Sequence, residues 1–315
     1  MTYILFIVGF YFLIKGASWL VDGASSIAKK FNVSDLMIGL TIVSFGTSAP
    51  ELIVNLFASF QGSSDLAVAN IVGSNISNIL LILGVAAVIY PLAVRKGTIT
   101  KEIPLSLLAA VVLWFMANDA MIDKAGQSAL TRIDGSVLLM FFVIFLYYTF
   151  GIAKVEGTGE EIKEHKNWKA ILMILAGMTG LALGGKWIVD GAIEIAQRFG
   201  MSEAMIGLTI VAIGTSLPEL AASAVAAFRH KADIAIGNVV GSNIFNVFWI
   251  LGISSIIKPI YFSPMLNFDI YFMAVVTVIL LAFMFIGRRN VLQRWQGASL
   301  IGLYVAYIIY LVIRG

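Results

Sequence analysis

The sequence predicts an all-α polytopic membrane protein with ten transmembrane helices arranged as two inverted repeats of five helices each. Three observations lead to this fold class: the composition, a series of apolar runs and an internal repeat. Of the 315 residues, 60% are hydrophobic and 12% are charged, and the mean hydropathy is +0.95. Soluble domains are about 45–50% apolar and about 25% charged, so this composition excludes a soluble globular enzyme.

Ten apolar runs are candidate membrane spans, since a helix needs about 20 mainly apolar residues to cross the bilayer. The absence of cysteine excludes disulfides and thiolate chemistry, and both histidines lie in polar connections. No imidazole is therefore expected inside the membrane. The expected spans are residues 3–27, 36–60, 66–89, 104–118, 134–153, 168–196, 204–228, 234–256, 268–286 and 296–313.

The distribution of lysine and arginine predicts the orientation of these spans. With the N-terminus outside, the cytoplasmic connections hold 14 of the 21 basic residues, and the outer connections and C-terminus hold 5. This bias obeys the positive-inside rule, so both termini are expected outside a plasma (inner) membrane. The net charge of +3 gives no indication of nucleic-acid binding. The lipid bilayer is the expected surrounding, and no protein partner is predicted.

An internal repeat divides the chain into two halves. Residues 36–84 align with residues 204–252 without a gap, and 27 of the 49 positions are identical. We expect a first half at 1–153, a cytoplasmic linker at 154–167 and a second half at 168–315. Because each half has an odd number of spans, the second half enters the membrane from the opposite side. Inverted repeats of this kind are typical of secondary transporters with a binding site near the midplane.

Each repeat carries a helix-breaking proline beside a glutamate, in GTSAPE at 46–51 and GTSLPE at 214–219. Proline lacks the N–H of a helical residue and clashes with the carbonyl four residues earlier. Broken backbone at membrane depth is tolerated only where it is buried in protein or lines a wet cavity. Freed carbonyls, hydroxyls and a carboxylate are hard oxygen ligands, which suit Ca²⁺ or Na⁺ and do not suit zinc.

The glutamates themselves, Glu51 and Glu219, are predicted near the middle of the membrane. A lone carboxylate at that depth costs at least ~2.5–3.5 kcal/mol, and two neighbouring carboxylates repel each other unless cations or protons neutralise them. Helix packing alone explains such a duplicated pair poorly. Asn75 and Asn243 fit either a ligand role or bonding between helices, and both interpretations stay open.

These motifs, followed by GSNISN at 73–78 and GSNIFN at 241–246, resemble the cation/Ca²⁺ exchanger superfamily, and more closely its prokaryotic sodium/calcium exchanger branch. The resemblance implies an antiporter that exchanges Ca²⁺ for Na⁺ by alternating access, in which spans 1 and 6 slide across the core. It implies Glu51 and Glu219 as shared ligands of both ions. The further oxygen ligands that it implies are those of Thr47, Ser48, Thr215, Ser216, Ser44, Ala212, Ser74, Ser242, Asn78 and Asn246.

Asn246 departs from the pattern of some relatives, which carry Asp at the equivalent position. Two carboxylates give a maximum charge of −2, which matches one Ca²⁺ or two Na⁺, whereas a third Na⁺ would leave a buried positive charge. The same departure disfavours K⁺ co-transport. The alternative function is Ca²⁺/H⁺ exchange through the same two glutamates.

Two further classes of function fit less well. A channel usually needs a ring of subunits around a continuous pore. An intramembrane enzyme with a Ser–His dyad or a histidine-based zinc site is excluded by the lack of buried histidine, and two glutamates in equivalent environments do not make an acid/base pair. No catalytic residue and no cofactor is therefore expected. The predicted binding partners are Ca²⁺ and Na⁺ as transported ions, with H⁺ as the alternative.

Overall fold

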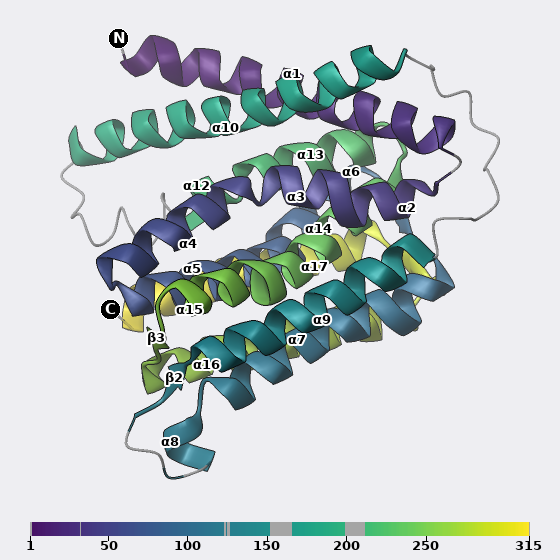
Figure 1. The fold of residues 1–315 in the computed structure, drawn as a ribbon. Helices are drawn as coiled ribbons and strands as arrows, with labels where there is room; N and C mark the ends of the chain where they lie inside the picture. Colours follow the sequence, from purple (N-terminus) through teal and green to yellow (C-terminus); the bar gives the residue numbers. More distant parts are fainter. Residues whose placement is uncertain are drawn as a thin grey trace.

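The computed structural model describes residues 2–31, 33–122, 124, 127–151, 166–198 and 212–314, and most of them are helical (Figure 1). The helices of residues 2–151 follow the first five predicted spans. Segments labelled η in this part are π-helical turns within longer helices. The elements are α1 (Thr2–Lys30), α2 (Asp35–Ile38), η1 (Gly39–Val43), α3 (Ser44–Thr47), α4 (Ala49–Gln61), α5 (Ser64–Ser77), η2 (Asn78–Ile82), α6 (Leu83–Ile89), η3 (Thr98–Glu102), α7 (Ile103–Met116), α8 (Asp119–Ile122) and α9 (Arg132–Gly151).

The helices of residues 166–314 follow the remaining predicted spans in the same manner. Here η5 is π-helical and η6 is a 3₁₀ turn. The elements are α10 (Asn167–Arg198), α12 (Ala212–Thr215), α13 (Leu217–Phe228), α14 (Ala232–Ile244), η5 (Phe245–Leu251), α15 (Gly252–Ile257), η6 (Pro264–Leu266), α16 (Asn267–Phe283) and α17 (Arg294–Arg314).

Eight helices among the described residues are long and apolar enough to cross a membrane, and one bent helix pair adds a ninth candidate. The predicted span 204–228 falls partly on residues 204–211, which lie outside the described residues; its described part holds α12 and α13. Of the predicted linker 154–167, residues 154–165 also lie outside the described residues. The described helices establish a polytopic membrane protein.

Four short strands are the departure from a purely helical fold. β1 (Leu92–Ala93) pairs with β4 (Val291–Leu292), and β2 (Ala129–Leu130) pairs with β3 (Ile260–Tyr261), both antiparallel. Each strand has two residues, which is too short to show the alternation by which a strand is recognised in a sequence. They pair backbone groups of connections that leave or enter the long helices, where no helical hydrogen bond is available. β1 and β3 are separated by the repeat offset of 168 residues.

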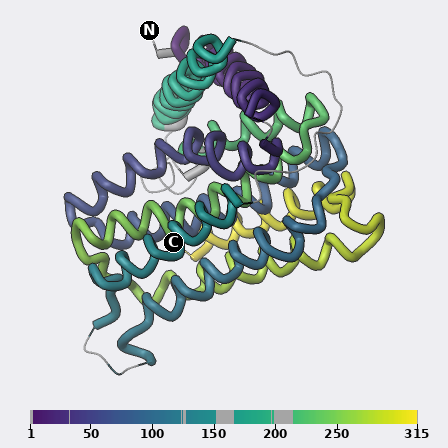
Figure 2. Tube along the Cα trace, turned by 45° about the vertical axis from the view of Figure 1, so that its right-hand side comes forward, coloured from purple at the N-terminus to yellow at the C-terminus, as the bar shows by residue number. Residues whose placement is uncertain are grey.

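α1 and α10 form a separate layer on one side of the other helices, as both views show (Figures 1 and 2). Glycines let their backbones touch. A Cβ on Gly16 would lie 2.8 Å from the carbonyl oxygen of Gly177, and a Cβ on Gly184 would lie 2.7 Å from that of Gly9. Small residues at such crossings are the usual means of packing helices in lipid, where no hydrophobic drive between helices exists.

The centre of the molecule is built from two long helices of the repeats. One is the run α5–η2–α6 and the other is α14–η5–α15. In each of them 78% of the most apolar stretch of 18 residues is buried inside the protein, against 33% in α1 and in α10. The segments that carry the GSNISN and GSNIFN motifs are therefore shielded from lipid by the surrounding helices.

Candidate cation site

The two proline motifs interrupt their helices at the same position. Ser48 separates α3 from α4 with φ −82° and ψ 7°. The half-helices on its two sides are bent by 47°. Ser216 separates α12 from α13 with nearly the same backbone, φ −85° and ψ 2°. Pro50 and Pro218 lie in the first turn after each break, where the missing N–H costs no helical hydrogen bond. The helix breaks predicted from the two prolines are therefore confirmed.

Two buried glutamates follow these breaks directly. Glu51 in α4 and Glu219 in α13 are each 1% exposed. Both lie in the first turn of their half-helix, where the positive end of the helix dipole favours a negative charge. Ser48 Oγ, at the break that precedes Glu51, donates a hydrogen bond to Glu219 Oε1 (2.9 Å). The fold thus brings together the two carboxylates that the sequence separates by 168 residues.

Four asparagines join the two central helices through reciprocal hydrogen bonds. Asn75 Nδ2 donates to the carbonyl of Asn243 (3.2 Å), and Asn243 Nδ2 donates to the carbonyl of Asn75 (3.4 Å). Asn78 Nδ2 donates to Asn243 Oδ1, and Asn246 Nδ2 donates to Asn75 Oδ1, both at 2.9 Å. Every amide atom of Asn75 and Asn243 is therefore engaged between helices, which favours the helix-bonding interpretation for these two residues.

A group of buried oxygens around this centre has no hydrogen-bond partner within the described part of the chain. An unsatisfied buried polar atom costs about 1–3 kcal/mol, so such a group is unfavourable unless something else binds it. A cation coordinated by oxygen would satisfy all of them at once. The atoms are Glu51 Oε2, Glu219 Oε2, Asn78 Oδ1, Asn246 Oδ1, Ser74 Oγ, Ser216 Oγ and Thr215 Oγ1.

The other expected ligands lie in the same region but are partly occupied. Ser242 Oγ is 2.9 Å from Ser48 Oγ. The Ser44 carbonyl already accepts hydrogen bonds from the Ser48 N–H (2.9 Å) and from Thr47 Oγ1 (3.3 Å). Ala212 is the first described residue of α12. The region contains no group of three or more His, Cys, Asp and Glu side chains among the described residues, so its donor set consists mainly of hydroxyls and amides.

One buried residue beside the site was not selected from the sequence. Asn238 in α14 accepts a hydrogen bond from Thr47 Oγ1 (3.0 Å) and donates to Ser223 Oγ (2.9 Å). The sequence did contain an indication, because Asn238 and Asn70 are identical at the repeat offset and both lie in apolar segments. Identity between the repeats at a polar position inside a span is the pattern that would have identified them.

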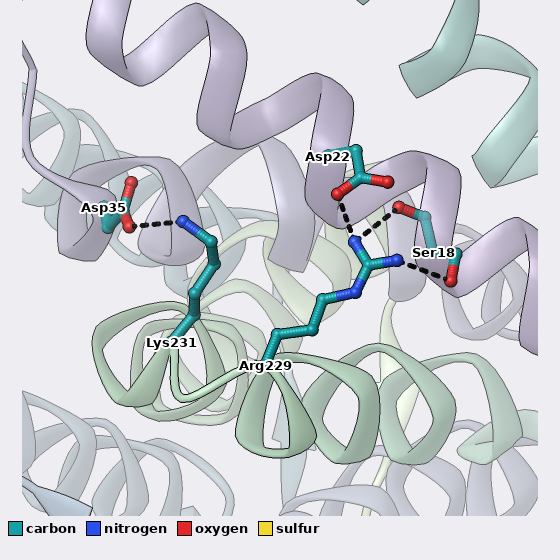
Figure 3. A network of polar contacts seen from close by, with 5 residues as sticks. All are labelled: Ser18, Asp22, Asp35, Arg229 and Lys231. Carbon is teal, nitrogen blue, oxygen red and sulfur yellow. Dashed lines mark hydrogen bonds and ion pairs between the residues drawn. The ribbon is translucent and has the colours of Figure 1, made fainter. Parts of the chain in front are cut away.

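Ion pairs link the first two helical segments to the end of α13 (Figure 3). Arg229 pairs with Asp22 of α1 and donates to Ser18 Oγ at 2.9 Å. Lys231 pairs with Asp35 of α2 at 3.4 Å. Both basic residues lie between α13 and α14, so these contacts connect α1 and α2 to the helices that carry Glu219 and Asn238.

Comparison with known proteins gives consistent matches over nearly the whole chain. The model of the family described as "Sodium/calcium exchanger protein" matches residues 1–151 and 169–313. The sodium/calcium exchanger MaX1 of Methanosarcina acetivorans is 33% identical, with 98% of each chain covered. The inner membrane protein YrbG of Escherichia coli is 36% identical, with 96% of this chain and 94% of that protein covered.

A solved structure shows the same fold. The sodium-calcium exchanger NCX_Mj superposes with a TM-score of 0.84 and 31% sequence identity, covering 98% of this chain and 97% of that one. The structure was obtained after soaking with Na⁺ and Ca²⁺. Both repeats of the present chain, with their buried glutamates, lie within the matched regions.

Proposed function

Because the chain belongs to the sodium/calcium exchanger protein family, we propose that it is a secondary-active antiporter that exchanges Ca²⁺ for Na⁺ across the membrane by alternating access. The observation that carries this proposal is the buried pair Glu51 and Glu219 at two helix breaks. Around them lie oxygens that no described side chain satisfies. Such a centre requires a cation, and its ligands are those that Ca²⁺ and Na⁺ prefer.

The coupling follows from competition for this charge. With both glutamates ionised the centre carries −2, which one Ca²⁺ or two Na⁺ neutralise. An empty centre with two repelling carboxylates is unfavourable in a closed, dehydrated state. The protein therefore changes its open side only when one ion species is bound, and Ca²⁺ moves in one direction as Na⁺ moves in the other.

The proposed ligand set is the one expected from the sequence. Glu51 and Glu219 bind both ions, and Asn78 and Asn246 present their unpartnered Oδ1 atoms at the middle. Hydroxyl oxygens complete the set together with backbone carbonyls at the two breaks. These further ligands are Thr47, Ser48, Ser74, Thr215, Ser216 and Ser242 by side chain or backbone, and Ser44 and Ala212 by carbonyl.

We extend the proposal to the arrangement in the membrane. The two halves, 1–153 and 168–315, are inverted repeats of five helices, and 154–167 is a cytoplasmic linker in a plasma (inner) membrane protein. The reciprocal bonds between Asn75 and Asn243 support a two-fold relation, because they exchange when 168 is added to or subtracted from each number. Both termini are then outside, and residues 229–231 face the cytoplasm.

The competing function is Ca²⁺/H⁺ exchange. Within the described part of the chain no lysine or arginine pairs with Glu51 or Glu219. Two protons would therefore neutralise the carboxylates as well as two Na⁺ would. Only the coupling ion differs between the two functions, so a flux measurement distinguishes them.

The test is ⁴⁵Ca²⁺ uptake into proteoliposomes preloaded with Na⁺ or with K⁺ at matched pH, with wild type, Glu51→Gln and Glu102→Gln. Glu102 is the matched control, since it is also 1% exposed but accepts a hydrogen bond from Tyr148 (2.6 Å) outside the site. We expect uptake only with internal Na⁺, lost in Glu51→Gln and retained in Glu102→Gln. Uptake that ignores Na⁺ and follows an imposed pH gradient would establish proton coupling instead.

A further inference from the structure

The two sides of the candidate cation site carry corresponding residues in opposite states of hydrogen bonding. Each residue of one side matches a residue of the other at the repeat offset of 168. Only one of the five matched pairs differs in residue type. The Asn238 side comprises Thr47, Ser48, Ser223, Asn238 and Ser242. The Asn70 side comprises Thr215, Ser216, Asn55, Asn70 and Ser74.

On the Asn238 side one amide joins three helices. Asn238 of α14 is 0% exposed, and its Oδ1 accepts a hydrogen bond from Thr47 Oγ1 of α3 (3.0 Å). Its Nδ2 donates to Ser223 Oγ (2.9 Å) and to the carbonyl of Glu219 (3.4 Å), both in α13. The two broken helices are thereby held against α14, and this side of the site is closed by hydrogen bonds.

On the Asn70 side two amide atoms outside the proposed ligand set are buried but unpaired within the described part of the chain. The Asn55 amide nitrogen donates to the Ala67 carbonyl (2.9 Å), which leaves its oxygen as the free acceptor. The hydroxyls of Ser48 and Ser242 on the Asn238 side also lie 2.9 Å apart. The two unpaired amide atoms are Asn70 Nδ2 and Asn55 Oδ1.

An isolated unpaired donor or acceptor in a protein interior costs about 1–3 kcal/mol, so a cluster of both is costly to keep. Here the two unpaired atoms are complementary, an amide donor on Asn70 and an amide acceptor on Asn55. The Asn238 side shows that the same groups can pair with one another. In a second conformation the amides of the Asn70 side would form the corresponding hydrogen bonds while those of the Asn238 side were broken. Each side would then be hydrogen-bonded in one of the two conformations.

We propose that Asn238 and Asn70 are paired positioning residues of the transport cycle, each of which closes its own side of the site while the other is released. The inference rests on the proposed function and adds to it two residues that act through the broken helices rather than on the ion. In the orientation proposed above, the Asn238 side faces the cytoplasm. In the described conformation the cytoplasmic side of the site is then closed by hydrogen bonds, whereas the outer side is not.

The ion pairs of Figure 3 support this direction of closure. Lys231 directly precedes α14, so its pair with Asp35 and the pair of Arg229 with Asp22 lie at the same end of the bundle as Asn238. They draw α1 and α2 onto the helices that Asn238 joins. Hydrogen bonds near the site and ion pairs at the surface therefore close the same side.

The test compares the half-saturating Ca²⁺ concentration on the two faces of the membrane, in right-side-out and inside-out vesicles. The apparent affinity from a face is the intrinsic affinity multiplied by the fraction of protein open to that face. The ratio of the two half-saturating concentrations therefore follows the conformational equilibrium. We expect Asn238→Ala to shift this ratio about fivefold toward the inward-open state, as the loss of about one net hydrogen bond implies, and Asn70→Ala to shift it as far in the opposite direction.

Two further variants keep the result interpretable. Asn118→Ala removes an asparagine that exchanges hydrogen bonds with Asn267 (2.8 Å) away from the site, and it should leave the ratio unchanged. Ser223→Ala removes only one bond of Asn238, and it should shift the ratio in the same direction as Asn238→Ala but less, even if the latter fails to fold.

Opposite shifts for the two asparagines support the inference, and which shift belongs to which residue reports the orientation of the chain. Shifts in the same direction, or an unchanged ratio in active variants, would overturn it while leaving the antiporter function intact. Absence of Ca²⁺ transport by the wild type on either face would instead overturn the proposed function, and the inference with it.

Discussion

The outer pair α1 and α10 and the central pair α5–η2–α6 and α14–η5–α15 are both formed by corresponding helices of the two halves, yet different forces hold them together. The outer pair is joined at glycines, where carbonyls of one helix reach the backbone of the other. The central pair is joined by amide hydrogen bonds of Asn75 and Asn243. The most apolar stretches of 18 residues in the central pair are 78% buried, against 33% in the outer pair.

This difference indicates which part of the molecule is able to move. Hydrogen bonds between buried amides fix one register, because a shift would leave polar atoms unpaired inside the protein. The outer pair is linked to the rest of the molecule by Arg229, which pairs with Asp22 and bonds to Ser18, and the side chains of Arg229 and Asp22 are partly exposed. A rigid centre with a movable outer layer would allow the alternating access proposed above.

The largest predicted effect comes from separating the outer pair. Gly177→Val would place a Cβ 2.6 Å from the backbone nitrogen of Leu20, so the helices must move apart. Overpacking typically costs about 1–3 kcal/mol, and here backbone rather than a flexible side chain is in the way. We expect a lower melting temperature by fluorescence-detected size-exclusion chromatography and reduced Ca²⁺ uptake. Gly302→Val is the control, since no atom lies within 4 Å of a Cβ there; equal losses in both variants would contradict close packing as the cause.

A smaller effect is predicted at the centre. Asn243→Ala removes the acceptor of Asn78 and the donor to the Asn75 carbonyl. Hydrogen bonds between membrane helices are worth about 0.6 kcal/mol each on average, so the loss of stability should be about 1 kcal/mol. Asn75→Ala removes the two corresponding bonds and should cost the same amount. Thermal unfolding of the two variants side by side tests this, and a clearly unequal loss would show that the two halves are not equivalent at their centre.

Much of this architecture was predictable because it depends on local chemistry. The described helices follow the apolar runs, since burial in lipid depends on composition over about 20 residues. The breaks at Ser48 and Ser216 follow from Pro50 and Pro218, whose effect on a helix is set within one turn. The repeat also predicted that Glu51 and Glu219 would both lie near the middle of the membrane.

The remaining features depend on contacts that a single repeat does not contain. Asn238 bonds to α3 and to α13, and Asn70, its counterpart at the repeat offset, has a different bonding state. The bonding state of a buried amide cannot be predicted from a motif or from periodicity. The ion pair of Arg229 with Asp22 also joins residues 207 apart, and the sequence offers several other partners for each.

The smallest predicted effect concerns this ion pair, and it tests whether the outer layer is held weakly. The side chains of Arg229 and Asp22 are 30% and 41% exposed, and ion pairs at such positions contribute about 0.2–1 kcal/mol. Arg229→Gln should therefore change the initial rate of Ca²⁺ uptake by less than about fivefold. The difference from wild type should shrink as the ionic strength is raised with choline chloride, because salt screens exposed charges.

Lys186→Gln provides the matched control, since Lys186 pairs with Asp190 within α10 and no ion pair among the described residues joins it to another helix. It should leave the rate unchanged at every ionic strength. A loss in Arg229→Gln as complete as in Glu51→Gln, and independent of salt, would contradict the comparison drawn above. The outer layer would then be fixed to the core as firmly as the two central helices are fixed to each other, and the movement that opens the site would have to occur elsewhere.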